Sequence, residues 1–229
     1  METDRVYAVI SGDIVQSRRF SSMGPLLRDA IKQAYLQCAE AFDDALGGLP
    51  EVDVFAGDSW QVLVSSPARS LRVGLCMRAL LKSYRELPSA DTRIAIGIGD
   101  VEFVDEDSLS QSQGEAFMLS GEALDRLRDE SVRMAVSLPE RWTAHVTEQL
   151  FEPQGTLDAM MALLDAICAD WTARQAGIIS RALMGRTQVE TAQEMSISQP
   201  AVSQSLDAAK WAAVEGPLQW WESTARYKS

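Results

Sequence analysis

Two Gly-Asp pairs lie at the ends of strand-like runs that are far apart in the sequence. "AVISGDIVQS" contains Gly12-Asp13, and "DVFAGDSW" contains Gly57-Asp58. If the two strands are neighbours in one sheet, the carboxylates would face each other and repel unless a divalent cation lay between them. Such oxygen ligands suit Mg²⁺ or Mn²⁺, which usually complete their shell with phosphate. The pairs predict a metal and nucleotide site; the alternative is that each pair is ordinary turn chemistry.

The segments that must position these pairs are, in order, strand, helix, strand, strand, helix and strand. Apolar, β-branched runs predict the strands, and apolar residues three and four apart predict the helices. This order predicts an α+β fold with a ferredoxin-like antiparallel sheet and both helices on one face. The expected strands are 5–14, 51–56, 59–65 and 92–104, and the expected helices are 25–46 and 67–87, with Ser66 capping the second.

The pattern changes in the second half of the chain. A helix at 120–129 and a strand at 133–139 follow the predicted sheet, and beyond Pro139 only helical periodicity is seen. This change predicts two domains, 1–139 and 140–229.

The N-terminal motifs resemble those of class III nucleotidyl cyclases. "YAVISGDIVQS" is similar to their first metal motif, "VFAGDSWQVLV" to their Gly-Asp hairpin, and "RIAIGIGDV" and "LSGEALDRL" to two later segments. With its helical half, the chain resembles the SatD-type family, which joins such a domain to a helix-turn-helix. The resemblance implies that Asp13, Asp58 and the Ile14 carbonyl hold Mg²⁺ or Mn²⁺. It also implies that a nucleotide is bound by Val15, Gln16, Ser17, Arg18 and Gly57.

Three matched positions depart from the cyclase pattern. Val54 stands where the resemblance implies a base-reading lysine, Met118 where it implies an acidic base-reading residue, and Asp125 where it implies the asparagine that orients the ribose. The metal and phosphate half of the site is kept, whereas the base and sugar half is not. Whether the chain is an enzyme therefore stays open.

The stretch 172–209 contains two helix-start signals and a tight turn. Thr172 with Gln175 and Thr187 with Glu190 match the capping box, and Gly185 follows the first predicted helix. A further helix is predicted to begin after Ser198, with Pro200 in its first turn. Small Ala192, apolar Ile197 and Val202, and Ser196 at the usual glycine position have the spacing of a helix-turn-helix. This segment resembles the DNA-reading regions of bacterial transcription regulators and sigma factors.

If the segment reads DNA, its polar residues fall into two groups. Gln199, Ser203 and Gln204 would face the bases of the major groove. Arg186, Thr187 and Gln188 would contact phosphates. The alternative is a three-helix bundle that binds protein, because this face is polar but scarcely basic.

Charge indicates that such a reader would act as a dimer. The net charge is −12, and from Asp170 onward six Lys and Arg are balanced by six Asp and Glu. A neutral unit binds DNA weakly alone, so we expect a homodimer on two half-sites. Trp211, Val214, Leu218 and Trp221 form an apolar stripe, interrupted at Gly216-Pro217, that is either core or shared between two chains.

Other residues are assigned structural roles. Cys38, Cys76 and Cys168 are expected to be buried, reduced thiols, and His145 a structural residue. Arg78, Lys82 and Arg85 lie on one helix face, which we interpret as solvated although it could reach phosphate. No apolar run is long enough for a membrane span and the start "METDRVYAV" is unlike a signal peptide, so a cytoplasmic location is expected.

The favoured function is a DNA-binding transcriptional regulator whose cyclase-like domain binds a nucleotide and a divalent metal as effector. The alternatives are an active nucleotidyl cyclase or nucleotidyltransferase that its helix-turn-helix localises or dimerises, and a DNA-binding protein with an inert cyclase-like scaffold.

Overall fold

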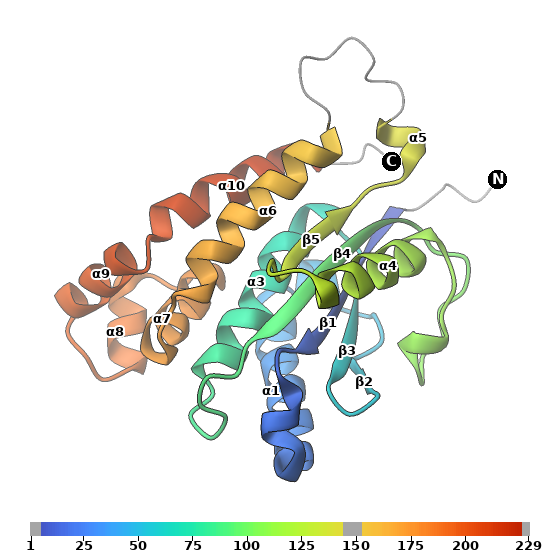
Figure 1. Cartoon of the computed structure of the whole chain (residues 1–229). Coiled ribbons are helices and arrows are strands. Elements are labelled where there is room, and N and C mark those ends of the chain that lie inside the picture. Colours follow the sequence, from blue (N-terminus) through green and yellow to red (C-terminus); the bar gives the residue numbers. More distant parts are fainter. Residues whose placement is uncertain (1–5, 144–152, 226–229) are drawn as a thin grey trace.

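The computed structural model describes residues 6–143 and 153–225. It shows an α+β protein in which one five-stranded mixed sheet is followed by a helical C-terminal half (Figure 1). Within these ranges, the search for a helix long and apolar enough to cross a bilayer found none. His145 lies outside the described residues.

The sheet has the strand order β2-β3-β1-β4-β5, with β1 at its centre. β4 and β5 run parallel, and the other neighbouring strands are antiparallel. The β-branched and apolar residues of β1 are almost wholly buried, as expected for a strand covered on both faces. The strands are β1 Val6–Ile14, β2 Asp53–Phe55, β3 Ser59–Val64, β4 Thr92–Asp100 and β5 Met134–Ser137.

Helices cover the two faces of the sheet unequally. α1 (Gly24–Ala41) and α3 (Pro67–Ser83) pack on one face, and α4 (Glu115–Asp129) packs on the other (Figure 1). Short 3-10 turns precede α1 and α4: η1 Ser17–Met23 and η2 Leu109–Gln111. Alternation along each strand therefore divides its side chains between the α1/α3 face and the α4 face.

Gly97 lets α4 lie directly on the sheet. A Cβ atom at this position would overlap the Ala116 carbonyl oxygen and the Ser120 amide nitrogen of α4. The backbone of β4 and the first turns of α4 are therefore in contact, which fixes the height of α4 above the sheet.

The helical half packs against α3 and β5. α6 runs beside β5, α7 and α10 contact α3, and α9 contacts α7, α8 and α10. One apolar cluster runs from Ile10 in β1 through α3 to Trp221 in α10. The division at 139/140 stays a prediction, but the apolar core is continuous across it. The helices are α5 Glu140–Thr143, α6 Pro153–Ala169, α7 Ala173–Leu183, α8 Gln188–Glu194, α9 Gln199–Ala208 and α10 Trp211–Thr224.

Both edges of the sheet are engaged by other parts of the chain. At the β5 edge, Gln154 of α6 donates its side-chain amide to the Val136 carbonyl oxygen at 2.7 Å. At the other edge, the Asp53 carboxylate of β2 accepts hydrogen bonds from the Ser108 hydroxyl at 3.1 Å and the Ser110 amide at 2.9 Å. The loop that contains η2 is thereby fixed to β2.

Several predicted bounds were wrong: the helix expected at 67–87 ends at Ser83, the strand expected at 92–104 ends at Asp100, and the helix expected at 120–129 begins at Glu115. The helix expected at 25–46 is interrupted at Phe42, where the backbone leaves helical geometry and the ring is buried, and α2 (Asp43–Leu46) follows. Ser66 is the N-cap residue of α3 as predicted, although its side chain makes no capping hydrogen bond. α10 continues through Pro217, because the buried residues on both sides of the proline lie on one face of a single helix.

The apolar stripe of α10 belongs to the core of this chain. Val214, Leu218 and Trp221 are buried, and the Trp221 indole donates to the Pro67 carbonyl oxygen at 3.0 Å. Trp211 is half-buried against the same cluster. All three cysteines are buried free thiols, as predicted.

Candidate functional site

Asp13 lies on the α4 face of β1 with both carboxylate oxygens occupied. The Arg93 guanidinium donates to Oδ1 at 3.0 Å, and the Arg128 guanidinium donates to Oδ2 at 3.0 Å. Only 8% of the Asp13 side chain is exposed, whereas 48% of the Arg128 side chain is. Register explains the first pair, since Asp13 and Arg93 are directly opposite each other on β1 and β4.

Asp58 lies at the hairpin end beside Asp13. The Ile14 amide donates to the Asp58 carbonyl oxygen at 3.3 Å, and Ser59 is the register partner of Asp13. The pKa of Arg128 is raised chiefly by its hydrogen bond with Asp13, against the opposing effect of burial, and further by the charges of Asp13, Asp125 and Asp58. Asp13 and Asp58 therefore both act on the same guanidinium.

The predicted metal ligands are near one another but are not arranged as a coordination shell. In residues 6–143 and 153–225, no group of three or more His, Cys, Asp or Glu is placed to hold an ion. A divalent ion on Asp13 would have to displace Arg93 and Arg128 from its oxygens. The Mg²⁺ or Mn²⁺ site at Asp13, Asp58 and Ile14 stays a prediction that requires these side chains to move.

The predicted phosphate-binding segment is a turn at the end of β1. The Val15 amide donates to the Asp91 carbonyl oxygen at 2.8 Å, so it is not available to a phosphate in this conformation. Gln16 has left-handed backbone angles (φ 55°, ψ 39°) and begins η1, which contains Ser17 and exposed Arg18. A left-handed residue followed by helical residues can turn successive amides toward an anion. Gly57 has a φ of 94° in the facing hairpin.

The three positions that depart from the cyclase pattern have different surroundings. Val54 packs against the apolar core, and 54% of Met118 is exposed on α4. Asp125 is exposed and pairs with Arg128 at 2.5 Å, so Arg128 bridges Asp125 and Asp13. Asp125 thus holds an arginine in this structure.

A hydrogen-bonded chain runs beneath Asp13 to the start of β4. The Trp60 indole donates to the Thr92 hydroxyl at 3.0 Å, and that hydroxyl donates to the Asp13 carbonyl oxygen at 2.8 Å. The neighbouring residue, Asp91, accepts at Oδ1 from the Thr92 amide at 2.9 Å. The backbone of the Asp13 turn is thereby tied to Asp91 through both Thr92 and Val15.

Arg78 is buried, which corrects its interpretation as part of a solvated helix face. It pairs with Asp91 through Nε at 2.8 Å and Nη2 at 3.0 Å, and with Asp165 of α6 through Nη1 at 2.6 Å. Lys82 is also largely covered and lies 3.4 Å from Asp91, whereas Arg85 is exposed. These ion pairs, together with Arg133 bonded to Asp91 at 2.7 Å, connect β4, α3, β5 and α6.

Burial and ion pairing act in opposite directions in this cluster. Burial alone would raise the pKa of Asp91, but the hydrogen bond and charge of Arg78, with Lys82 and Arg133, lower it below its ordinary value. Burial alone would lower the pKa of Arg78, but Asp91 and Asp165 raise it. Burial also raises the pKa of the neighbouring Cys168 thiol to about 12, so this thiol stays protonated.

The second candidate site is the pair α8 and α9, joined by the turn 195–198. Both capping boxes form as predicted, and the Ser198 hydroxyl accepts from the Ala201 amide. Ser196 has a φ of 55°, the left-handed conformation that a glycine adopts without strain. Ala192 and Val202 are buried where the two helices meet, and the Trp171 indole donates to the Ala209 carbonyl oxygen at 3.0 Å.

The predicted DNA contacts lie mostly on the exposed side of this pair. Gln199 and Gln204 are exposed on α9, and Ser203 is half-buried. Gln199 donates to the Gln188 side-chain oxygen at 2.6 Å, so these two residues are brought together. The Thr187 hydroxyl serves the cap of α8, and Arg186 is exposed with its guanidinium 3.5 Å from Glu194.

The arginines that hold Asp13 were not identified from the sequence. Arg93 could have been found, because a β1–β4 pairing places it opposite Asp13. Arg128 carried no comparable signal, since its approach depends on the path of α4 across the sheet.

The fold and the two sites define a five-stranded α+β protein with a helical half whose α8–α9 pair presents polar side chains. No protein-family model matches the sequence, and the search of curated proteins returned no match.

Proposed function

We propose that this chain is a DNA-binding transcriptional regulator in which α8 and α9 form a helix-turn-helix. The observation that carries the proposal is the α8–α9 pair itself, with left-handed Ser196 in its turn, buried Ala192 and Val202 between its helices, and exposed glutamines on α9. A glutamine amide can pair with adenine in two hydrogen bonds, and an exposed helix of this kind fits the major groove.

Charge supports binding as a dimer. Arg181 and Arg186 both lie beside Glu194, so the cationic side chains near α8 are partly neutralised within the chain. A single copy would gain little from phosphate contacts, whereas two copies on two half-sites double the base contacts. Because the α10 stripe is core, the homodimer surface must lie elsewhere.

The test uses Gln204→Ala, with Gln219→Ala at an exposed residue of α10 as the matched control. After selection of a binding sequence from a random duplex pool, affinity is measured for that sequence and for a scrambled duplex. We expect Gln204→Ala to bind the selected sequence about tenfold more weakly, because one base contact contributes about 1–3 kcal/mol. Equal affinities of Gln204→Ala and Gln219→Ala for the selected sequence would contradict base reading by α9.

The α+β half is proposed to be a ferredoxin-like, cyclase-related domain that binds a nucleotide as effector. The strand order β2-β3-β1-β4 and the placement of α1 and α3 on one face support this assignment. β5 extends the sheet as a parallel edge strand.

Charge exchange gives the nucleotide proposal a physical basis. Arg93 and Arg128 neutralise Asp13 in this structure. Asp13, Asp58 and the Ile14 carbonyl would hold Mg²⁺ or Mn²⁺, and the two released arginines would be free to pair with phosphate oxygens. Neutralisation of the carboxylates would then pass from guanidinium to metal, so no carboxylate would be left buried without a cation.

The test is a melting screen with each nucleoside triphosphate plus Mg²⁺ or Mn²⁺. A ligand at 100 times its dissociation constant adds about 2.7 kcal/mol of stability. We expect the wild type and the exposed control Asp170→Asn to gain melting temperature equally, and Asp13→Asn to gain none. No gain for the wild type would favour an inert scaffold, and cyclic or pyrophosphate products in the same samples would favour the enzyme alternative.

A further inference from the structure

Two neighbouring helices of the C-terminal half, α6 and α10, each turn large apolar side chains toward solvent. Leu163 of α6 is 70% exposed, and Trp220 of α10 is 47% exposed. Residues three and four positions away lie on the same face of each helix and are also apolar and at least half-exposed. We call the resulting surface the outer α6–α10 face, and it consists of Met160, Leu163, Ile167, Ala213, Pro217 and Trp220.

Helical geometry places this face away from the contacts that hold each helix. Leu163 is about two and a half turns from Gln154, which binds the edge of β5, so the two residues lie on opposite sides of α6. Trp220 is two positions from Glu222, which pairs with Arg72 of α3, so these residues lie on nearly opposite sides of α10. α6 and α10 contact each other, with α6 between β5 and α10 in the view of Figure 1.

The outer α6–α10 face carries no charged side chain. Neither helix contains a lysine or an arginine. Asp165 and Glu222 pair with arginines of α3, and Asp158 lines a cavity beside β5. Glu215 is half-buried and is two positions from Ala213, hence nearly opposite it on the helix.

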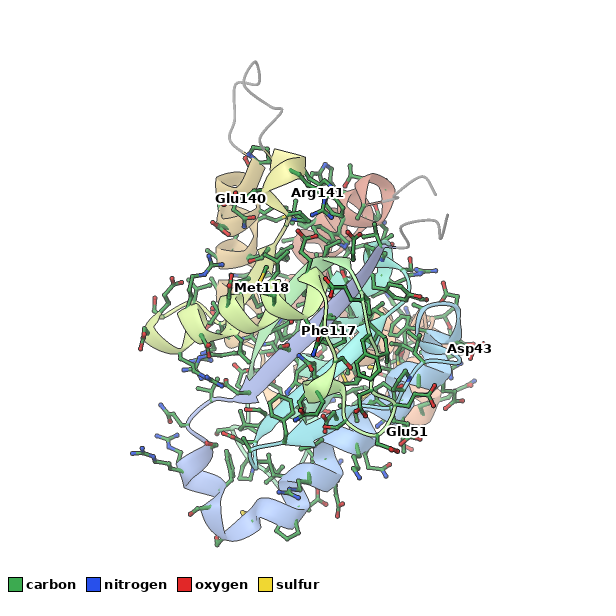
Figure 2. All side chains as sticks on the ribbon, turned by 90° about the vertical axis from the view of Figure 1, so that its right-hand side faces the viewer. Asp43, Glu51, Phe117, Met118, Glu140 and Arg141 are labelled. Atoms are coloured by element: carbon green, nitrogen blue, oxygen red, sulfur yellow. The ribbon has the colours of Figure 1, made fainter. Side chains whose placement is uncertain are left out.

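The surface around α4 differs in this respect. Met118 is 54% exposed there, and Figure 2 shows Glu140 and Arg141 on the same face of the molecule. Arg141 pairs with Asp100 at 3.0 Å and also with Glu115. An exposed apolar side chain on this surface therefore has charged neighbours, unlike Leu163 and Trp220.

Charge indicates which partner fits the outer α6–α10 face. The net charge of the chain is −12, so two copies repel unless the surfaces that meet are uncharged. A nucleic acid or an anionic bilayer would need lysine or arginine beside the apolar residues, which these helices lack. A second copy of the chain would meet the same uncharged, apolar face, and no charge would lose its water.

The size of the face agrees with a weak homodimer. α6 has 17 residues and α10 has 14, which gives lengths of about 25 Å and 21 Å. At about 10 Å of width each, the pair presents about 500 Å², and a symmetric dimer would bury about 1,000 Å² in total. This area is near the minimum for a specific interface, so the dimer should be reversible.

We propose that the outer α6–α10 face is the interface of a homodimer in which each copy packs this face against that of the other. The inference rests on the proposed function for the expectation of a homodimer, and it assigns the surface. It is separate from the buried stripe of α10, which lies on another side of that helix. Two DNA half-sites would hold the copies close together, so a weak interface would be enough.

The test is sedimentation velocity of the full chain without DNA. We expect the wild type to pass from monomer to dimer between about 1 and 100 µM, the range that suits so small an interface. Leu163→Lys should raise the dissociation constant by about tenfold or more, because a symmetric interface would bury two lysines. This change makes the net charge less negative, so repulsion between whole molecules would not explain the loss.

Two further variants make the test specific to this face. Trp220→Ala should also raise the dissociation constant by about tenfold, because an aromatic contact is lost. The control Leu36→Lys alters a side chain of α1 that is 47% exposed and lies outside the face, and it should dimerise like the wild type. All three replaced side chains are exposed, so their melting temperatures should stay close to that of the wild type.

Three results would overturn the proposal. They are a wild type that stays monomeric at about 100 µM, unchanged dimerisation of both Leu163→Lys and Trp220→Ala, and equal weakening by Leu36→Lys. Failure of the proposed function gives a different result. A dimer that Leu163→Lys weakens, in a chain that selects no DNA sequence, would support this interface and contradict DNA reading.

Discussion

Asp13 is a buried carboxylate that depends on two cationic side chains from other elements. Arg93 reaches it from the neighbouring strand and Arg128 from α4. Removing either arginine would leave one carboxylate oxygen of buried Asp13 without a cation, which is costly. The sequence identified the aspartate, but its partners depend on strand register and on the path of a helix, which no local pattern encodes.

Close packing at Gly97 leads to a prediction about a single methyl group. Gly97→Ala would drive a Cβ into the backbone of α4, so we expect a loss of about 2 kcal/mol or more in the free energy of unfolding. The control is Gly121→Ala in α4, where a Cβ meets no atom within 4 Å. That change should stabilise by about 0.5–1 kcal/mol through helix propensity. Urea unfolding of both variants measures the contrast, and equal effects would refute the predicted backbone contact.

The Asp91 ion pairs predict a particular pH dependence. Because the folded-state pKa of Asp91 lies below its ordinary value, the stabilisation is complete above about pH 3.9 and is lost as pH falls through the folded-state pKa. We expect Asp91→Asn to cost roughly 3–5 kcal/mol near neutral pH, since buried Arg78 keeps only Asp165 and loses the carboxylate that it binds through two nitrogens. The difference from the wild type should be constant between pH 5 and 7, shown by urea titrations, and should shrink in acid. An Asp91→Asn difference that instead grew in acid would contradict this assignment.

The two helix starts that carry a capping box were predicted correctly, because this motif is recognised from two residues three positions apart. Thr172 and Thr187 begin helices as expected. Helix interiors were less well predicted at Phe42 and Pro217. The break at Phe42 accompanies burial of its ring, and α10 continues through Pro217 because residues on both sides of the proline are buried. Both depend on tertiary contacts.

The turn between α8 and α9 can be tested through its backbone. Ser196 occupies a left-handed conformation that costs a non-glycine residue about 1–2 kcal/mol. Ser196→Gly should therefore stabilise the protein by about 0.5–1 kcal/mol after the extra entropy of the unfolded glycine is included. The converse change, Gly185→Ala at a φ of 79°, should destabilise by about 1 kcal/mol. Thermal melting measures both, and a lower melting temperature for Ser196→Gly would count against the turn.

At the scale of the molecule, the two halves share one core and one buried ion cluster. Arg78 binds Asp91 at the start of β4 and Asp165 in α6. The sequence showed a change of period near 139, but it could not show that the helical half packs on α3. The reason is that the sequences of α3 and α6 each predict a helix with one buried face. Such a pattern does not show which element covers that face.

This shared core predicts that the halves unfold together. We expect a single urea transition with coincident tryptophan fluorescence and circular dichroism. Asp165→Asn should lower the free energy of unfolding by roughly 3 kcal/mol, because Arg78 loses one of its two partners. The single transition should therefore move to a lower urea concentration. The control Asp170→Asn, exposed just beyond α6, should change stability by less than about 0.5 kcal/mol. Two separated transitions in the wild type would show that the halves are independent.

The hydrogen bonds that α6 and the η2 loop make to the outer strands have a consequence for aggregation. Open sheet margins are the usual starting points for intermolecular strand pairing and fibril growth. Here the edge strand β5 lies beside α6. The other edge strand, β2, is only three residues long, and its Asp53 carboxylate is hydrogen-bonded to the loop that contains η2. The native protein should therefore resist aggregation by strand pairing at high concentration, and fibril formation should require release of one of these two covers.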